Sequence, residues 1–248
     1  MSTSKLSATL VQSAVCKIGS YLRRPHPSMF YYPGLSSPAP VVPNRLFPEL
    51  TETLKSAYPS IMDEYKALRK KQAMSGTSEG ASDYKETNEH KKLHSGDWAW
   101  QSYVQKGKRS TDFAVQCPRT CEALESLPNF MTGTPFSFAF FSTLGKGASI
   151  AAHTGPCNLR LRVHFPLIVP AGDCGMQIGE ADVTWREGEP VIFDDAYLHR
   201  VWNNGEGDRV VLLFDVWHPE LYPDEIEAIQ ELFADQQKQN ELRNDMIP

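Results

Sequence analysis

The sequence predicts a mainly β protein with flanking helices, built around a double-stranded β-helix of the jelly-roll or cupin-like kind. From Pro135 onward, short apolar segments of period two are separated by Gly, Asp and Pro, a pattern typical of strands joined by tight turns. No helices alternate with these segments, which disfavours a parallel α/β sheet. The expected strands are Phe136–Leu144, Leu159–Val169, Gly175–Ile178, Asp182–Trp185, Pro190–Phe193, His199–Trp202 and Arg209–Trp217.

Helices are expected before and after this core. Apolar residues at three- and four-residue steps predict a helix over Phe47–Leu68, and Cys121–Leu127 predicts a short one that Pro128 ends. Tyr222–Asn240 is expected to form a closing helix. The expected organisation is a helix or targeting leader at 1–25, a Pro-rich and helical front part at 26–134, the β core at 135–221 and a C-terminal helix at 222–248.

Length and charge bound the class of protein. The 248 residues suit one domain, and a net charge of −5 argues against a general nucleic-acid binder. No run of apolar residues is long enough for a transmembrane helix, and the sequence gives no signal of oligomeric state. The five cysteines fit reduced thiols better than a disulfide framework, and the spacing of Cys117 and Cys121 fits a helical turn.

The first 48 residues contain neither Asp nor Glu, and their start is rich in Ser and amphipathic. Such a segment is typical of an organelle transit peptide, and a helix that packs on the domain has the same pattern. We therefore expect a cytoplasmic protein, with the mitochondrion or another organelle as the alternative.

Three polar residues share one face of the expected strand at 159–169. Alternation places Arg160, Arg162 and His164 on one side and Leu161 and Val163 on the other. If the polar face points into a barrel mouth, it can bind an anion. The alternative is the solvated face of a half-exposed sheet, which spacing alone favours.

Two histidines and an arginine follow an order that is similar to that of jelly-roll iron oxygenases. His153 precedes His199 by 46 residues, and Arg209 follows ten residues later. In such enzymes two histidines and a carboxylate hold Fe(II), and the basic residue holds 2-oxoglutarate. The carboxylate normally lies two residues after the first histidine, where this chain has Gly155, so spacing alone does not carry the assignment.

Longer motifs resemble the aspartyl/asparaginyl β-hydroxylase family. These motifs are HTGPCNLRLRVH at 153–164, WREGEPVIFDD at 185–195, HRVW at 199–202 and the stretch from Arg209 through DVWHPE at 215–220. The resemblance runs from about Phe30 to Leu221. It implies an oxygenase fold, and it implies an iron site of two histidines in which glycine takes the place of the carboxylate, so Gly155 is the expected residue.

The resemblance also implies the roles of the site residues. His153 and His199 would be the Fe(II) ligands. Arg209 and Ser142 would hold the C5 carboxylate of 2-oxoglutarate, and Arg162 and His164 would lie near its C1 carboxylate. Arg160 is a candidate for a substrate carboxylate. Trp98 matches a tryptophan of the family, for which substrate contact and core packing are both open.

Three acidic residues near these motifs have structural interpretations. Asp194 and Asp195 lie four and five residues before His199, where a turn or a supporting role is expected and metal ligation is not. Asp215 shares the face of Arg209, and a structural role is expected for it as well.

The resemblance thus implies a dioxygenase that uses Fe(II), 2-oxoglutarate and O2 to hydroxylate an unactivated carbon. The target it implies is the β-carbon of an Asp or Asn residue in a peptide or protein. Alternatives are a hydroxylase of a free amino acid or another small molecule, and a non-catalytic jelly-roll binding protein. A cupin-like metal enzyme that does not use 2-oxoglutarate is a further alternative, which Arg209 disfavours.

Overall fold

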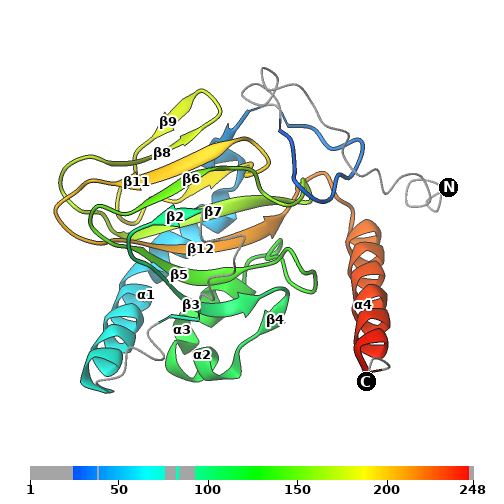
Figure 1. Cartoon of the computed structure of the whole chain (residues 1–248), viewed down its shortest axis with the longest axis horizontal. Coiled ribbons are helices and arrows are strands. Elements are labelled where there is room, and N and C mark those ends of the chain that lie inside the picture. The colour runs from blue at the N-terminus through cyan, green and yellow to red at the C-terminus, as the bar shows by residue number, and fades with distance from the viewer. Residues whose placement is uncertain (1–24, 38, 76–81, 84–92, 246–248) are drawn as a thin grey trace.

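Two antiparallel sheets form the body of the protein (Figure 1). The computed structural model describes residues 25–37, 39–75, 82–83 and 93–245, so residues 1–24 of the expected leader lie outside the described part. Every pairing between the strands of these two sheets is antiparallel. The expectation of a mainly β, jelly-roll-like core is confirmed.

The larger sheet is continuous from the front part of the chain into the core. Its order is β1 (Val41–Val42), β10 (Val191–Phe193), β7 (Arg160–Ile168), β12 (Arg209–Trp217), β5 (Ala139–Leu144), β3 (Trp98–Gln105) and β4 (Lys108–Arg109). The smaller sheet has the order β2 (His94–Ser95), β6 (Ser149–His153), β11 (His199–Asn203), β8 (Cys174–Ile178) and β9 (Ala181–Val183).

All seven expected strands are present with small shifts at their ends, and Arg209–Trp217 is found at the expected bounds. Four strands before residue 135 and β6 were not expected. Strands β1, β2 and β4 have only two residues each, β6 has the small-residue sequence SIAAH, and β3 (WAWQSYVQ) shows little contrast between its two faces. Strand pairing, which no local pattern reveals, makes them part of the sheets.

Helices cover the outer face of the larger sheet. They are the 3-10 turn η2 (Asn44–Leu46), α1 (Pro48–Ser75), α2 (Thr111–Gln116) and α3 (Pro118–Glu125). The last helix, α4 (Pro223–Asp245), projects from the other end of the molecule (Figure 1). The expected helix at 47–68 thus extends seven residues further, to Ser75. Both Cys117, which caps α3, and Cys121 within it are free and buried, as expected for a helical turn.

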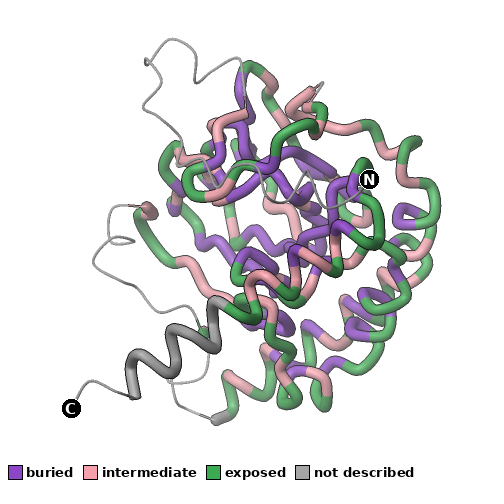
Figure 2. Tube along the Cα trace, turned by 90° about the vertical axis from the view of Figure 1, so that its right-hand side faces the viewer, coloured by how far each residue is buried: buried purple, intermediate pink, exposed green. Residues whose placement is uncertain are grey.

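The main apolar core lies between α1, α3 and the larger sheet. Leu161, Val163 and Phe165 of β7 point into it, together with Leu54 and Ile61 of α1. Figure 2 shows buried residues concentrated in the central strands and exposed residues on the outer turns. Because this core takes one face of β7, the other face, with Arg160, Arg162 and His164, is directed to the space between the sheets.

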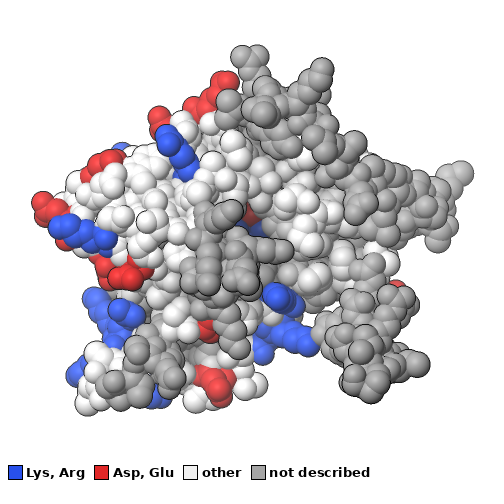
Figure 3. Space-filling view, viewed as in Figure 1, with Lys and Arg blue, Asp and Glu red and all other residues white. Residues whose placement is uncertain are grey.

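Within the described residues, no helix has the length and apolar character needed to cross a membrane. On the face shown in Figure 3, acidic and basic side chains lie mainly along the left edge and the lower part, and much of the remaining described surface is uncharged.

Packing of α1 on the sheet predicts a large stability effect at Leu54, which is fully buried. Leu54→Ala should lower the free energy of unfolding by about 2–5 kcal/mol, because it removes buried methyl groups and leaves a cavity. The exposed Lys66 on the same helix is the matched control, and Lys66→Ala should stay within about 0.5 kcal/mol of wild type. Urea unfolding measures both variants, and equal losses would contradict this placement of α1.

Candidate active site between the two sheets

A cavity of about 230 Å³ opens between the sheets. It contains every residue that the sequence nominated for the site, and aromatic side chains that it did not nominate. The lining includes His153, His199, Ser142, Arg209, Arg160, Arg162, His164 and Trp98, together with Trp100, Phe138, Phe140 and Phe193. The polar face of β7 is therefore an interior surface and not a solvated one.

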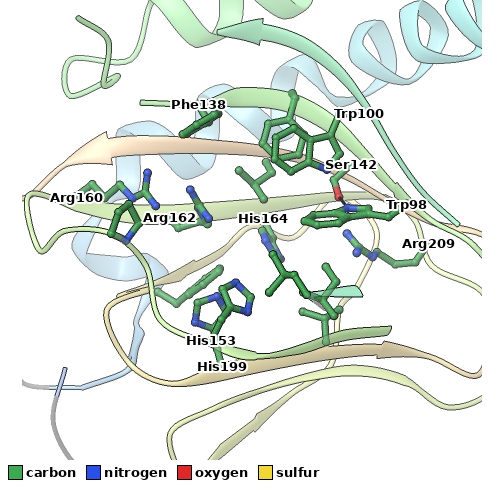
Figure 4. A pocket seen from close by; sticks show the side chains of 17 residues that line it. Trp98, Trp100, Phe138, Ser142, His153, Arg160, Arg162, His164, His199 and Arg209 are labelled. Carbon is green, nitrogen blue, oxygen red and sulfur yellow. Dashed lines mark hydrogen bonds between the residues drawn. The ribbon is translucent and has the colours of Figure 1, made fainter. Parts of the chain in front are cut away.

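The two histidines are brought together by strand pairing. His153 ends β6, His199 begins β11, and the two residues are partners in the antiparallel register, with ring centroids 4.1 Å apart. In Figure 4 they lie side by side at one wall of the pocket. Residues 46 positions apart in the sequence thus form one pair because β6 and β11 are neighbours in the smaller sheet.

Both rings are held in the same tautomer. Nδ1 of His153 lies 2.8 Å from the carbonyl oxygen of Ala151, and Nδ1 of His199 lies 2.8 Å from that of Tyr197. A carbonyl oxygen only accepts, so each Nδ1 carries the hydrogen and each Nε2 keeps its lone pair. This arrangement is the usual support for a metal-binding imidazole.

Burial also favours the neutral form of these rings. Desolvation lowers the pKa of His199 to about 3, with the neighbouring His153 as the second cause. Desolvation likewise lowers the pKa of His153. A neutral imidazole is the form that coordinates a metal ion. The Nε2 atoms of His153 and His199 can therefore act as ligands without a change of protonation or of tautomer.

At the far end of the pocket, Arg209 is a buried cation that forms no ion pair with any described residue. Its side chain is 1% exposed, and its Nε and Nη1 atoms have no hydrogen-bond partner among the described residues. Desolvation lowers the pKa of Arg209 to about 10, which leaves it charged at neutral pH. A buried guanidinium of this kind is a strong indication of an anion that completes the site.

Ser142 on β5 lies beside Arg209 in the pocket and is oriented by Trp98 on β3 (Figure 4). The indole Nε1 of Trp98 donates to Ser142 Oγ at 3.0 Å. An indole N–H can only donate, so the serine oxygen accepts and its hydroxyl hydrogen is left for an acceptor in the pocket. Trp98 thus has a defined place next to the Ser142–Arg209 end of the site.

The two arginines of β7 have acidic partners inside the protein. Arg160 Nη2 lies 2.5 Å from Asp195 Oδ2 and its Nη1 lies 2.9 Å from Asp215 Oδ2. Arg162 is bound to the same two carboxylates. Its Nη1 lies 3.2 Å from Asp195 Oδ2, and its Nε lies 2.9 Å from Asp215 Oδ1. We call these four residues the Arg–Asp cluster.

The cluster accounts for two acidic residues that sequence reasoning left as structural. Burial alone would raise the pKa of Asp195, but Arg160 and Arg162 lower it well below the usual range. Arg160 is also bonded to the carbonyl oxygen of Phe136, so its guanidinium is committed to the protein. The expected contact between Arg160 and a substrate carboxylate would have to compete with these bonds. Arg162 remains 15% exposed toward the pocket.

His164 lies between these groups, and its Nδ1 has no hydrogen-bond partner in the described part of the chain. Its burial, followed by the charge of Arg209, holds the pKa of His164 well below the usual value. The ring of Phe193 meets it edge-on at 4.9 Å. His164 is therefore a neutral, fixed polar group that faces the ligand space.

An apolar wall closes the pocket opposite the histidines. Trp100 stacks on Phe140 with centroids 4.1 Å apart, and Phe138 meets Trp100 edge-on at 6.2 Å. Trp100 and Phe138 could not be nominated from the sequence beyond their aromatic character. Trp100 reaches the pocket because β3 pairs with β5, where its partner in the register is Ser142.

Gly155 is a position without room for a side chain. A Cβ atom built there would lie 2.5 Å from Asp195 Oδ2, and the Gly155 amide already donates to the Asp195 carbonyl oxygen at 2.6 Å. The carboxylate of the Arg–Asp cluster therefore occupies the space that a side chain at 155 would need.

The cluster predicts that Arg160 acts on stability. Arg160→Met leaves two buried carboxylates with one cation, which should cost about 3–5 kcal/mol of unfolding free energy. Arg119→Met is the control, because Arg119 forms an exposed pair with Glu122 that is worth about 0–1 kcal/mol. Urea unfolding gives both values. A folded Arg160→Met protein of wild-type stability that fails to bind ligand would instead favour a substrate contact.

The crowding at Gly155 predicts that a carboxylate cannot be added there. Gly155→Asp should lower stability by at least about 1–3 kcal/mol and should not raise metal affinity, because the new side chain displaces Asp195 from its arginines. Gly207→Ala is the control, since its Cβ meets nothing closer than 4.0 Å. Thermal unfolding and Mn(II) titration test this, and tighter Mn(II) binding in a stable Gly155→Asp protein would contradict it.

Comparison with known proteins agrees with the geometry. Residues 55–219 match the model of the family described as aspartyl/asparaginyl beta-hydroxylase. A human aspartyl/asparaginyl beta-hydroxylase is 38% identical over 128 residues, covering 52% of this chain and 17% of that protein. Aspartate beta-hydroxylase domain-containing protein 2 of Xenopus tropicalis is 30% identical over 231 residues, covering 90% of this chain and 60% of that protein.

The chain thus spans between a sixth and three fifths of the length of these two relatives. A Pseudomonas putida prolyl-4-hydroxylase structure aligns with 65% of this chain and 86% of its own at 15% identity, with a TM-score of 0.39, too slight a likeness to assign chemistry. The family match, which covers most of the chain and all of the pocket strands from β3 to β12, identifies the chain as a member of the aspartyl/asparaginyl beta-hydroxylase family.

Proposed function

We propose that this protein is a 2-oxoglutarate- and Fe(II)-dependent dioxygenase that hydroxylates an unactivated carbon. The observation that carries the proposal is that one small cavity holds both a histidine pair with fixed tautomers and a buried arginine, Arg209, for which the described ranges provide no acidic partner. The first suits a metal ion, and the second suits the distal carboxylate of a bound 2-oxo acid.

The residues at the histidine wall fit Fe(II). Nε2 of His153 and Nε2 of His199 would hold the ion, because the Nδ1 atoms are engaged by backbone carbonyls. Among the described residues, no carboxylate joins them in a group of three possible ligands. Two protein ligands leave open positions for a bidentate cosubstrate and for O2.

The opposite end fits a dicarboxylate. Arg209 would bind the C5 carboxylate of 2-oxoglutarate, and the Ser142 hydroxyl would donate to the same group. His164 and the partly exposed Arg162 would lie near the C1 carboxylate. The aromatic wall of Trp98, Trp100 and Phe138 would exclude water from the reacting centre.

When bound, Fe(II) with 2-oxoglutarate and O2 supplies the oxidising chemistry that replaces a C–H hydrogen by hydroxyl. The protein's contribution is geometric and electrostatic: two fixed imidazoles, one buried cation and a dry cavity. Arg160 and Arg162 hold the Asp195 carboxylate beside the site. This carboxylate is therefore not free to bind a metal ion together with the two histidines.

The proposed target is the β-carbon of an Asp or Asn residue in a peptide, supported by the names of the family and of the relatives. A free amino acid or another small molecule is the alternative. The direct experiment incubates purified protein with Fe(II), 2-oxoglutarate and O2, with and without peptides that carry one Asp or Asn. Succinate formation that rises with the peptide, together with a mass gain of one oxygen atom on that residue, is expected.

If free Asp or Asn stimulates succinate formation and no peptide is oxidised, the results would favour a hydroxylase of small molecules. Absence of 2-oxoglutarate binding to the metal-loaded protein would overturn the dioxygenase proposal and favour a non-catalytic protein or an unrelated metal enzyme.

The assignment of His199 as a metal ligand predicts that its replacement abolishes iron binding and activity. His199→Ala leaves a single protein ligand, so Fe(II) retention after desalting and succinate formation should both fall to background. His26→Ala is the control, because His26 lies outside the pocket lining. Metal content by elemental analysis and succinate by chromatography measure the effect. Unchanged iron content in His199→Ala would contradict the assignment.

A further inference from the structure

Trp185 packs against the Arg209 guanidinium from outside the set of residues that line the pocket. It belongs to the connection between β9 and β10, is 4% exposed and is not part of the pocket lining. The guanidinium carbon of Arg209 lies over its ring, 5.1 Å from the centroid. The same ring lies 5.9 Å from that of His164.

The charge of Arg209 is balanced differently from that of the two arginines on β7. Arg160 and Arg162 each pair with two carboxylates, whereas no ion pair involves Arg209 in the described ranges. A desolvated cation without a counter-ion is costly, and a flexible side chain would escape to solvent if the structure allowed it. Among the residues that the structure describes, a group other than a carboxylate therefore has to hold this guanidinium inside the protein.

An aromatic face is the group that can do so without consuming the positive charge. A cation over an indole ring is attracted by the ring quadrupole, most strongly when both are desolvated, and Trp is the best of the aromatic residues for this. A carboxylate at the same place would neutralise Arg209 and compete with an incoming anion. The indole face leaves the charge and the N–H groups of Arg209 available.

We propose that Trp185 is a positioning residue, whose indole face holds the charged Arg209 guanidinium toward the pocket and so prepares it for the distal carboxylate of the cosubstrate. This inference rests on the proposed function. Trp185 does not touch the ligand, and it acts through Arg209 alone. It therefore controls selectivity for 2-oxo acids that carry a second carboxylate.

Two other roles for Trp185 lead to different results. Its Nε1 has no hydrogen-bond partner among the residues that the structure describes, so the N–H could donate to a ligand. The ring also packs with Leu144, Cys174 and Phe193 in an apolar cluster, so it could be a core residue only. Trp185→Phe keeps an aromatic face and removes the N–H, whereas Trp185→Leu keeps apolar volume and removes the face.

The experiment titrates Mn(II)-loaded protein with two ligands by calorimetry. The ligands are 2-oxoglutarate and 2-oxovalerate, which has the same chain with a methyl group in place of the C5 carboxylate. Trp185→Leu should bind 2-oxoglutarate about tenfold to thirtyfold more weakly than wild type, the scale of a desolvated cation–π contact. Trp185→Phe should lose roughly threefold. Affinities for 2-oxovalerate and for Mn(II) should stay unchanged in both variants.

Two controls separate positioning from general damage. Trp217 is equally buried but lies in a different apolar cluster, so Trp217→Leu reports what loss of a buried indole does to any ligand. In an Arg209→Met background, Trp185→Leu should have no further effect on 2-oxoglutarate affinity, because the group it positions is gone.

Each possible result of these titrations distinguishes between the roles of Trp185. Equal 2-oxoglutarate affinity in wild type and Trp185→Leu overturns the inference and leaves the proposed function intact. A Trp185→Phe loss as large as that of Trp185→Leu overturns it in favour of the indole N–H. Parallel losses for both ligands overturn it in favour of core packing. No binding of 2-oxoglutarate to wild-type Mn(II) protein overturns the inference together with the proposed function.

Discussion

The site depends on the neutralisation of two arginines, the buried Arg160 and the partly buried Arg162, by two buried aspartates. Arg160 and Arg162 come from β7, Asp215 from β12, and Asp195 from the turn before β11. Buried charges are tolerated only as pairs with good geometry, so this cluster ties the larger sheet to the turn that leads into His199. Because the four charges of this cluster balance one another, Arg209 is left as the positive charge that the proposed anionic cosubstrate would meet.

Much of this arrangement follows from sequence patterns. The period-two strands, the helix that begins near Phe47 and the closing helix were predictable from apolar spacing, and they are found within a few residues at most ends. Alternation alone placed Arg160, Arg162 and His164 on one face of β7. The family motifs nominated His153, His199, Ser142 and Arg209, and the structure brings these residues into one cavity.

Other parts were beyond local reasoning for physical reasons. Strand β3, with WAWQSYVQ, has little contrast between its faces, and its Trp100 reaches the pocket only through pairing with β5. The partners of Asp195 and Asp215 depend on which strands are neighbours, which spacing does not specify. The extension of α1 to Ser75 runs through Lys and Gln residues, where propensity sustains a helix after its apolar face has ended.

The close contact between Gly155 and Asp195 has an evolutionary consequence. A lineage that acquired a carboxylate at 155 would first have to vacate Asp195, and a lineage that lost Asp195 would leave Arg160 and Arg162 undercompensated in the interior. Either first step is unfavourable by itself, although both together exchange one carboxylate for another. As long as Asp195 keeps its two arginines, glycine is therefore favoured at 155, and each position limits which residues the other can acquire.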